Sequence, residues 1–142
     1  MKSELSHFLP YLLNRAAEVV SQDFQPNYKN RYGMLRTEWR VLFHLGRLGE
    51  MTASQICEQA ALHKTKVSRA VVALEHKRFV KRHKVETDRR SELLSLSKSG
   101  QAAFEDLSRA ASSYEADLEA VLGKAEIDRL KAILDKLIAE KS

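Results

Sequence analysis

The sequence predicts a mainly α protein with a small β-hairpin near its centre. Apolar residues recur at the spacing of a helix through most of the 142 residues. Two short segments between residues 80 and 96 are instead rich in branched or alternating residues, as strands are. A chain of this length with 44% hydrophobic residues can fill the core of one domain.

Positive charge is concentrated in one part of the chain. Residues 61–90 hold ten Lys and Arg against three Asp and Glu, within a chain whose net charge is +5. The remaining segments together carry a slight excess of acid. A basic centre between neutral or acidic segments is typical of a surface that binds an extended polyanion.

The sequence shows no sign of export or of a membrane segment. Its first 20 residues lack the continuous apolar region and the cleavage-like site of a signal peptide, and no stretch approaches the roughly 18 apolar residues of a span. We therefore expect a soluble cytoplasmic protein without a membrane partner. The single cysteine, Cys57, cannot form a disulfide within the chain.

The first half of the chain predicts two amphipathic helices separated by a loop. Apolar residues from Leu5 to Val20 follow helical spacing and indicate the first helix. Pro, Asn and Gly residues between Pro26 and Gly33 predict the loop. Apolar residues from Leu35 to Leu45 then indicate the second helix, which Gly46 or Gly49 can end.

Two further helices are predicted close together. Thr52 followed by Gln55 is a capping-box pattern, which predicts a short helix from about Ala53 to Ala60. A tight turn over residues 61–63 leads into the next helix. On a helical wheel the core side of that helix holds Val67, Ala70, Val71 and Leu74. The opposite side and its flanks present Thr65, Lys66, Ser68, Arg69, Val72 and His76.

The hairpin and two long helices complete the chain. We predict strands at Val80–Val85 and Glu92–Leu96, separated by the turn sequence ETDRRS. Ser97 is expected to cap a long helix, whose apolar stripe from Ala103 to Val121 follows a spacing of about 3.5. Gly123 ends that helix, and apolar residues from 127 to 138 predict the last one.

This order of elements is that of a winged helix-turn-helix, and the residues resemble the MarR family of bacterial transcriptional regulators. The run from LRTEWRVLF to LSLSKSG carries the resemblance, which extends over nearly the whole chain. Its sharpest part is Asp88-Arg89-Arg90 followed by L-x-L-S-x-x-G, similar to the family's wing and the exit from it. His63 departs from the pattern, because the family often has Asp there.

The resemblance implies a homodimer built as a single MarR-like domain over residues 1–142. Residues 1–33 and 100–142 would supply dimerisation helices that interlock with those of a second subunit. Residues 34–99 would form the winged helix-turn-helix lobe that binds double-stranded DNA. Such a dimer would also cover the long apolar stripe after Ser97, which one chain has little surface to bury.

The expected DNA contacts fall into three groups. Thr65, Lys66, Ser68 and Arg69 occupy the first turns of the second helix of the motif, which reach base edges in a major groove. Arg69 either forms two hydrogen bonds with a guanine or holds a phosphate, and Val72 can meet a thymine methyl. The resemblance implies that Arg90 enters the minor groove, and Asp88 either holds its guanidinium or is an ordinary turn residue. The remaining cations are expected either to neutralise phosphates of the DNA backbone or to be solvated; they are Lys64, Lys77, Lys81, Arg82 and Lys84.

The resemblance also implies regulation by a small molecule. Family members usually repress, and many release DNA when a small aromatic or lipophilic acid enters the crevice between the dimer base and the DNA-binding lobe. The residues that could line such a crevice, or could instead be core and interface residues, are Tyr11, Arg15, Trp39, Phe43 and His44.

Other classes of function have weaker support. His63, His76 and His83 have no zinc-like spacing, and Cys57 is expected to pack in the core instead of acting as a redox switch. We expect neither a metal nor a cofactor. The sequence lacks the motifs of hydrolases and nucleotide-binding enzymes, which argues against an enzyme. The alternative to a nucleoid-associated repressor on a palindromic operator is a sequence-tolerant DNA-coating protein without an effector.

Overall fold

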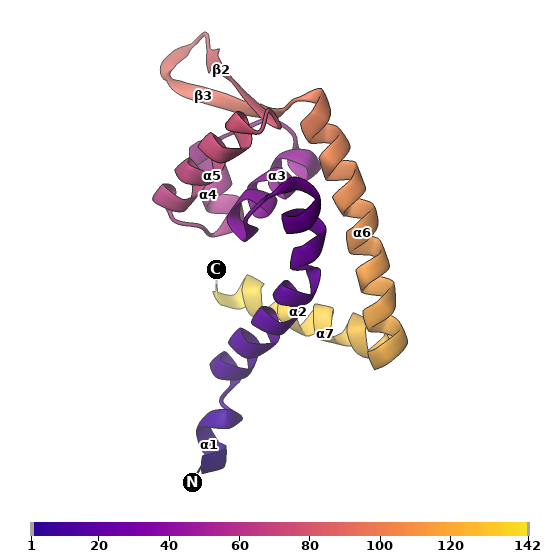
Figure 1. The fold of residues 1–142 in the computed structure, drawn as a ribbon. Helices are drawn as coiled ribbons and strands as arrows, with labels where there is room; N and C mark the ends of the chain where they lie inside the picture. Colours follow the sequence, from indigo (N-terminus) through magenta and orange to yellow (C-terminus); the bar gives the residue numbers. More distant parts are fainter. Residues whose placement is uncertain (1, 142) are drawn as a thin grey trace. The chain divides into compact units, whose positions relative to one another are not determined.

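The computed structural model describes the backbone of residues 2–141 and the side chains of residues 4–87 and 91–141. It confirms a mainly helical protein with a small antiparallel sheet (Figure 1). Two compact units divide the chain, residues 1–107 and residues 108–142. The elements in chain order are α1 (Lys2–Ser6), α2 (Leu9–Tyr32), α3 (Arg36–Leu48), β1 (Met51–Thr52), α4 (Ala53–Ala60), α5 (Lys64–His76), β2 (Val80–Val85), β3 (Asp88–Leu96), α6 (Lys98–Leu122) and α7 (Lys124–Lys141).

Helix α2 is longer than the sequence indicated, and the loop predicted between Pro26 and Gly33 is wrong. Proline removes one helical hydrogen bond, yet the helix continues through Pro26 for more than another turn. Phe24 and Tyr28 are buried on either side of this proline, and both rings pack on Trp39 of α3, at centroid distances of 5.8 and 6.1 Å. This aromatic packing stabilises the turns that local sequence would have released.

Helices α3, α4 and α5 form the centre of the first unit. The predicted bounds of α4 are confirmed, as are both hydrogen bonds of its capping box between Thr52 and Gln55. Helix α3 ends at Gly49, whose φ of 86° favours glycine. Gly46 lies inside α3 and does not end it. Close packing accounts for glycine at this position, because a β-carbon would fall 2.2 Å from the ring of Phe104 on α6. The fully buried side chains of this core include Val41, Leu42, Ile56, Val67, Leu74, Leu94 and Leu107.

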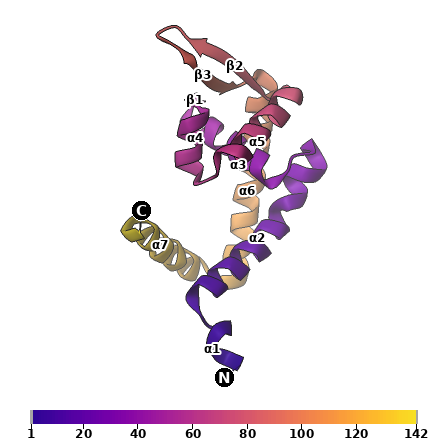
Figure 2. The ribbon, with the colours of Figure 1, turned by 90° about the vertical axis from the view of Figure 1, so that its left-hand side faces the viewer.

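The sheet has three strands instead of the predicted two. Met51 pairs with Leu94, so β1 adds a short edge strand and the order is β1-β3-β2. The turn of the hairpin consists of residues 86–87 alone, because β3 already begins at Asp88. The prediction that ETDRRS is entirely a turn is therefore wrong. Figure 2 shows the β2–β3 hairpin extending away from helices α3 to α5.

The beginning of α6 contacts the connection between α5 and β2. Ser97 Oγ accepts a hydrogen bond from the Gly100 amide at 3.0 Å, which confirms the predicted cap, and donates one to the Arg78 carbonyl. Gly100 is required by close packing, since a β-carbon there would lie 2.0 Å from the Phe79 carbonyl oxygen. The beginning of α6 is thus held directly against the connection between α5 and β2.

The second unit contains the later part of α6 and all of α7, joined at Gly123 with φ of 95°. An ion pair between Lys131 and Glu115 links the two helices. Large apolar side chains nevertheless remain exposed in this unit, among them Val121, Leu122, Leu130, Ile133 and Ile138. Within the described residues no helix is both long enough and apolar enough to cross a membrane.

Candidate nucleic-acid interface

Helix α5 has the two faces that the helical wheel predicted. Val67, Ala70, Val71 and Leu74 are all buried, and α5 packs mainly on α3 and α4. The opposite residues, Thr65, Lys66, Ser68, Arg69, Val72 and His76, are all exposed. Burial of one face therefore presents the six candidate DNA-contacting side chains together to the solvent.

The beginning of α5 is capped by an unexpected residue. His63 Nδ1 accepts a hydrogen bond from the Thr65 amide at 3.2 Å, which satisfies one of the free amides of the first turn. Only an unprotonated Nδ1 can accept this bond. The histidine therefore serves as the helix cap at the position where an aspartate was expected.

The end of α5 is held by a buried charge. Glu38 of α3 is 4% exposed, and its carboxylate accepts a hydrogen bond from Lys77 Nζ at 2.7 Å. Lys77 follows α5 directly, so this pair joins the end of α5 to α3. The contact does not favour the predicted neutralisation of a phosphate by Lys77, because its charge already balances a carboxylate inside the protein.

Arg82 also forms ion pairs with carboxylates of the protein. Its guanidinium bonds Glu75 of α5 at 2.7 Å and lies 3.4 Å from Glu92 of β3. The hydrogen bond with Glu75 is the main reason that the pKa of Arg82 lies above its ordinary value. Sequence reasoning missed the roles of these acids, because nothing in their local spacing shows which cation they meet.

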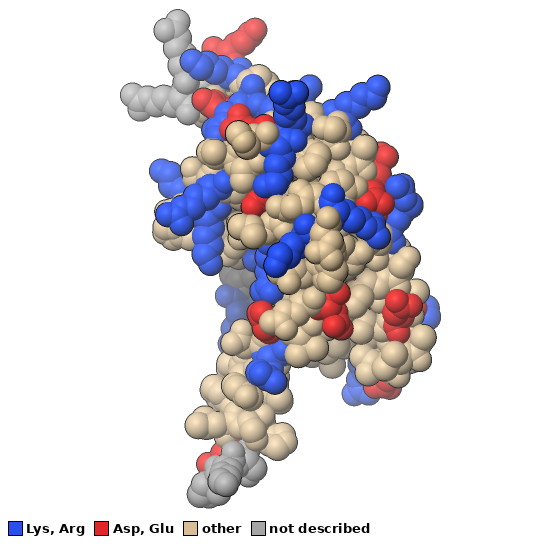
Figure 3. Space-filling view, viewed as in Figure 1, with Lys and Arg blue, Asp and Glu red and all other residues tan. Residues whose placement is uncertain are grey.

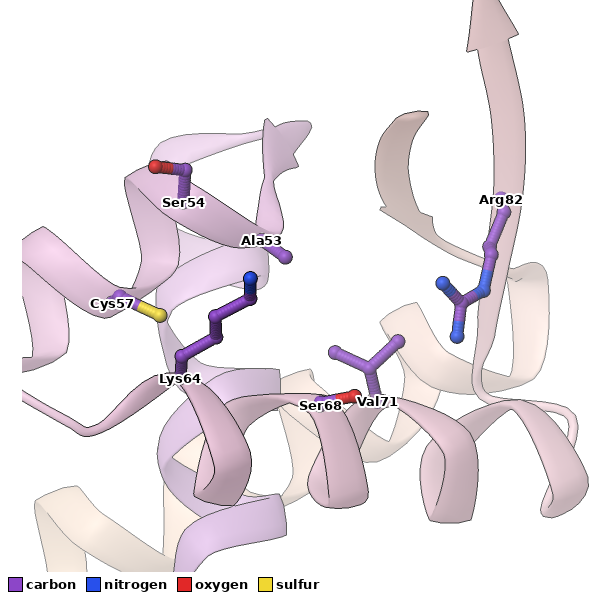
Figure 4. A pocket seen from close by; sticks show the side chains of 7 residues that line it. All are labelled: Ala53, Ser54, Cys57, Lys64, Ser68, Val71 and Arg82. Carbon is purple, nitrogen blue, oxygen red and sulfur yellow. The ribbon is translucent and has the colours of Figure 1, made fainter. Parts of the chain in front are cut away.

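A pocket of about 380 Å³ lies between α4, α5 and β2 (Figure 4). Lys64 and Arg82 point into it from opposite sides, and Ser68 supplies a hydroxyl, whereas the Ser54 hydroxyl is turned away. No acidic side chain is among the described residues that line it. Cys57 is half-buried, and its sulfur faces this pocket, so the prediction that it packs in the core is wrong. The lining suits an anionic oxygen group.

The hairpin β2–β3 carries the predicted basic tip. Lys84 pairs with Glu92, whereas the next residue, Val85, pairs with Asp88, so residues 89–91 form a bulge in β3. The side chains of Asp88, Arg89 and Arg90 lie outside the described residues. Their backbone nonetheless places them beside the hairpin turn, at the end of the hairpin that is farthest from the helices.

Charge on the first unit is unevenly distributed. Figure 3 shows many Lys and Arg side chains over the hairpin and the α5 region, whereas the surface at the beginning of α2 is largely uncharged. Lys64, Lys66, Arg69, Lys81 and Lys84 have no carboxylate partner among the described side chains. These unbalanced charges give the face with the hairpin and α5 its positive field.

The predicted effector residues do not all come together. Trp39, Phe43 and His44 of α3 line one hollow of about 430 Å³ with Arg40 and Gln59. Burial, followed by the charges of Arg40 and Arg47, lowers the pKa of His44. Among the described side chains, its buried Nδ1 has no hydrogen-bond partner.

The other two predicted effector residues belong to α2 and do not line this hollow. Tyr11 is 48% exposed and lines a separate, shallow apolar surface with Leu5, Ser6 and Phe8. Arg15 is exposed. The three α3 residues therefore form the more compact candidate.

The histidines considered as metal ligands have other places. His63 caps α5, and His83 Nε2 lies 3.1 Å from the carboxylate of Glu50. His76 is exposed on α5. The part of the chain that the structure describes holds no group of three or more His, Cys, Asp or Glu that could bind a metal ion.

Comparisons with known proteins agree with this architecture. The sequence model of the MarR family matches residues 32–91, which include α3, α4, α5, β2 and the beginning of β3. The transcriptional repressor CouR, solved on a 23-mer DNA duplex, has a TM-score of 0.87 and 25% identity, covering 97% of each chain. Over residues 32–91 the chain is similar to the MarR family. Members of this family are transcriptional regulators and not enzymes.

The curated relatives of this chain are regulators as well. YwoH of Bacillus subtilis, an HTH-type transcriptional regulator, is 25% identical over 116 residues, covering 82% of this chain and 83% of YwoH. FarR of Neisseria gonorrhoeae, also an HTH-type transcriptional regulator, is 25% identical over 125 residues, covering 88% and 85% of the two chains. The likeness to both therefore extends well beyond the segment that the family model matches.

The His63 cap is testable through stability. We expect His63→Ala to lower the free energy of unfolding by about 1 kcal/mol, because the Thr65 amide loses its acceptor. His63→Asp supplies another acceptor and should retain stability. Urea unfolding followed by circular dichroism measures both, with His76→Ala as the matched control on the same helix. Equal stability of His63→Ala and the wild type would show that this cap contributes nothing.

Proposed function

We propose that this protein is a repressor of the MarR family that binds a palindromic operator as a homodimer and responds to a small aromatic or lipophilic acid. The observation that carries the DNA-binding part is the exposed face of α5 beside a basic hairpin. A face rich in Lys and Arg offers a helix for a major groove, and the hairpin offers a tip for the adjacent minor groove. CouR, which shares this fold, was solved on duplex DNA.

The roles of individual residues follow from their places in this surface. We call α5 the recognition helix. Its first turns would reach base edges and phosphates of one major groove through Thr65, Lys66, Ser68 and Arg69. Val72 and His76 continue the same exposed face. The wing is the hairpin of β2 and β3, and Asp88, Arg89 and Arg90 at its tip would enter the minor groove. The pocket lined by Lys64 and Ser68 would receive a backbone phosphate.

A sequence-tolerant DNA-coating protein would share the positive field and lack the specific contacts. A nuclease footprint on the DNA upstream of the genes next to this one distinguishes the two. A regulator protects a single palindrome, whereas protection by a coating protein spreads as its concentration rises.

Arg69 is the clearest test of base reading. Its side chain is exposed on the second turn of the recognition helix, and no described carboxylate pairs with it. If it forms two hydrogen bonds with a guanine, Arg69→Ala should cost about 1–3 kcal/mol and relax the preference at one base pair of each half-site. Gel-shift titrations on operators varied one base at a time measure this. An even loss of affinity on all sequences would instead assign Arg69 to a phosphate.

The homodimer accounts for the exposed apolar side chains near both ends of the chain. Leu5, Phe8 and Leu9 on α1 and α2 are more than half exposed, and so is Ile133 on α7. Apolar surface of this extent on helices is typical of an interface. A two-fold axis would set two recognition helices about one DNA turn, roughly 34 Å, apart.

Ile133→Glu tests whether dimerisation is required. The side chain is 54% exposed in the single chain, so a charge there spares the chain's own core and enters the proposed interface. We expect a monomer that retains its helical content and loses specific operator binding by at least about tenfold. Light scattering and gel shifts measure these, with Lys136→Glu as the control on the same helix. A monomeric wild type that protects a whole palindrome would contradict the homodimer.

The effector is proposed to bind the hollow of Trp39, Phe43 and His44. Aromatic rings there can stack on an aromatic ligand, while Arg40 and the imidazole of His44 offer polar contacts to a carboxylate or hydroxyl. Trp39 is the only tryptophan in the sequence, so its fluorescence reports occupancy directly. We expect benzoate or phenylacetate to quench it in a saturable manner and to weaken operator binding.

His44→Ala and Tyr11→Ala locate this site. We expect His44→Ala to raise the dissociation constant of the acid at least about tenfold, since it removes a polar contact inside the hollow. Tyr11→Ala, outside the hollow, should change the constant little. Quenching that is unaltered by His44→Ala would exclude this hollow as the site.

A further inference from the structure

We propose that Arg82 is a positioning residue that holds the wing at a fixed orientation to the recognition helix. This inference rests on the proposed DNA-binding function and deepens it. It replaces the simpler role of Arg82 as one more cation for the DNA backbone.

One guanidinium joins three elements. Arg82 lies on β2, and its Nε and Nη2 both lie 2.7 Å from Glu75 Oε1 on α5. Its Nη1 lies 3.4 Å from Glu92 Oε2 on β3. Glu75 belongs to the last turn of the recognition helix, whereas Arg82 and Glu92 belong to the two strands of the wing. The planar guanidinium can therefore fix both strands against the helix at once.

Strand pairing and apolar packing hold the base of the wing, where the buried Leu94 of β3 pairs with Met51 of β1. Along β2 only Val80 is buried, and residues 81–84 are all exposed. Among the described side chains, two ion-pair contacts join residues 81–84 to residues outside the wing, Arg82 to Glu75 and His83 to Glu50. The second link is fully ionic only when His83 is protonated. Arg82, which pairs with Leu94, thus adds a permanently charged link between exposed β2 and α5 to this packed base.

The charge of Glu75 supports a positioning role. A carboxylate beside the proposed DNA-binding face repels phosphates, so DNA would bind more tightly without it if only the electrostatic field mattered. Arg82 pairs with two acids, so the cluster of these three side chains is net negative and does not attract DNA. Its surface ion pairs are also about one-third exposed, so little stability is expected from them. Since these ion pairs add neither attraction for DNA nor much stability, we assign them the role of orienting the wing.

Glu75→Gln gives the decisive measurement, because the two roles of Arg82 predict opposite signs. If Arg82 positions the wing, losing its carboxylate should weaken operator binding by about fivefold or more, even though a negative charge has been removed. If Arg82 serves the phosphates, the substitution frees its guanidinium and operator binding should become tighter. Fluorescence anisotropy with a labelled operator at fixed salt measures the difference.

Two variants control for charge and for folding. Glu58→Gln removes an exposed acid of α4 that has no ion-pair partner among the described residues, so it reports the field effect alone, with unchanged or tighter binding. Glu92→Gln breaks the second link and should weaken binding in the same direction as Glu75→Gln. Thermal unfolding of each variant shows that the compared proteins are folded at the temperature of the assay.

A double-mutant cycle with the wing tip tests whether the effect passes through the wing. In the wild type, Arg90→Ala is expected to weaken binding at least about tenfold, as loss of a minor-groove contact. In the Arg82→Met background the same change should cost much less, because the wing is no longer held in place. If the fold-losses in affinity of Arg82→Met and Arg90→Ala simply multiply in the double variant, Arg82 acts independently of the wing, and the proposal is overturned.

Failure of this inference is distinguishable from failure of the proposed function. A wild-type protein that protects no specific DNA site contradicts the regulator itself. A wild-type protein that protects a palindrome, with Glu75→Gln binding equally well or more tightly, contradicts only the positioning role of Arg82.

Discussion

Burial of one face of α5 is the constraint on which the rest of the structure depends. Val67, Ala70, Val71 and Leu74 are withdrawn from water against α3 and α4. Each fully buried side chain of this size, alanine excepted, is worth about 1.5–3 kcal/mol, which together fix the rotation of the helix about its axis. Once that rotation is set, the opposite side chains must face outward. An apolar residue such as Val72 then remains in solvent, 56% exposed, because the core side is already occupied.

The charge of the surface depends on pairing as much as on composition. Lys77 and Arg82 look like DNA-binding cations in the sequence, but Lys77 pairs with the buried Glu38, and Arg82 pairs at the surface with Glu75 and Glu92. The field that a polyanion would meet comes from cations without such partners. The paired cations instead connect α5 to α3 at one end and to the wing at the other. In this lobe the same residue types thus serve both attraction and alignment.

Helix α3 connects the two proposed activities of the lobe. Val41, Leu42 and Leu45 on one side belong to the buried core that carries α5, while Trp39, Phe43 and His44 line the hollow proposed for the effector. A ligand that shifts α3 would therefore move the support of the recognition helix. Glu38, buried and bonded to Lys77, would transmit such a shift to the end of α5 through a direct ionic contact.

The sequence by itself determined the features that arise between near neighbours. The capping box of α4, the buried face of α5 and the Ser97 cap depend on residues a few positions apart, so spacing alone predicts them. Tertiary structure decided the rest. Packing on Trp39 carries α2 through Pro26, pairing of Met51 with Leu94 creates β1, and Arg82 meets carboxylates on two other elements. These partners are brought together only when the chain folds, and local hydrogen bonding and periodicity contain no information about them.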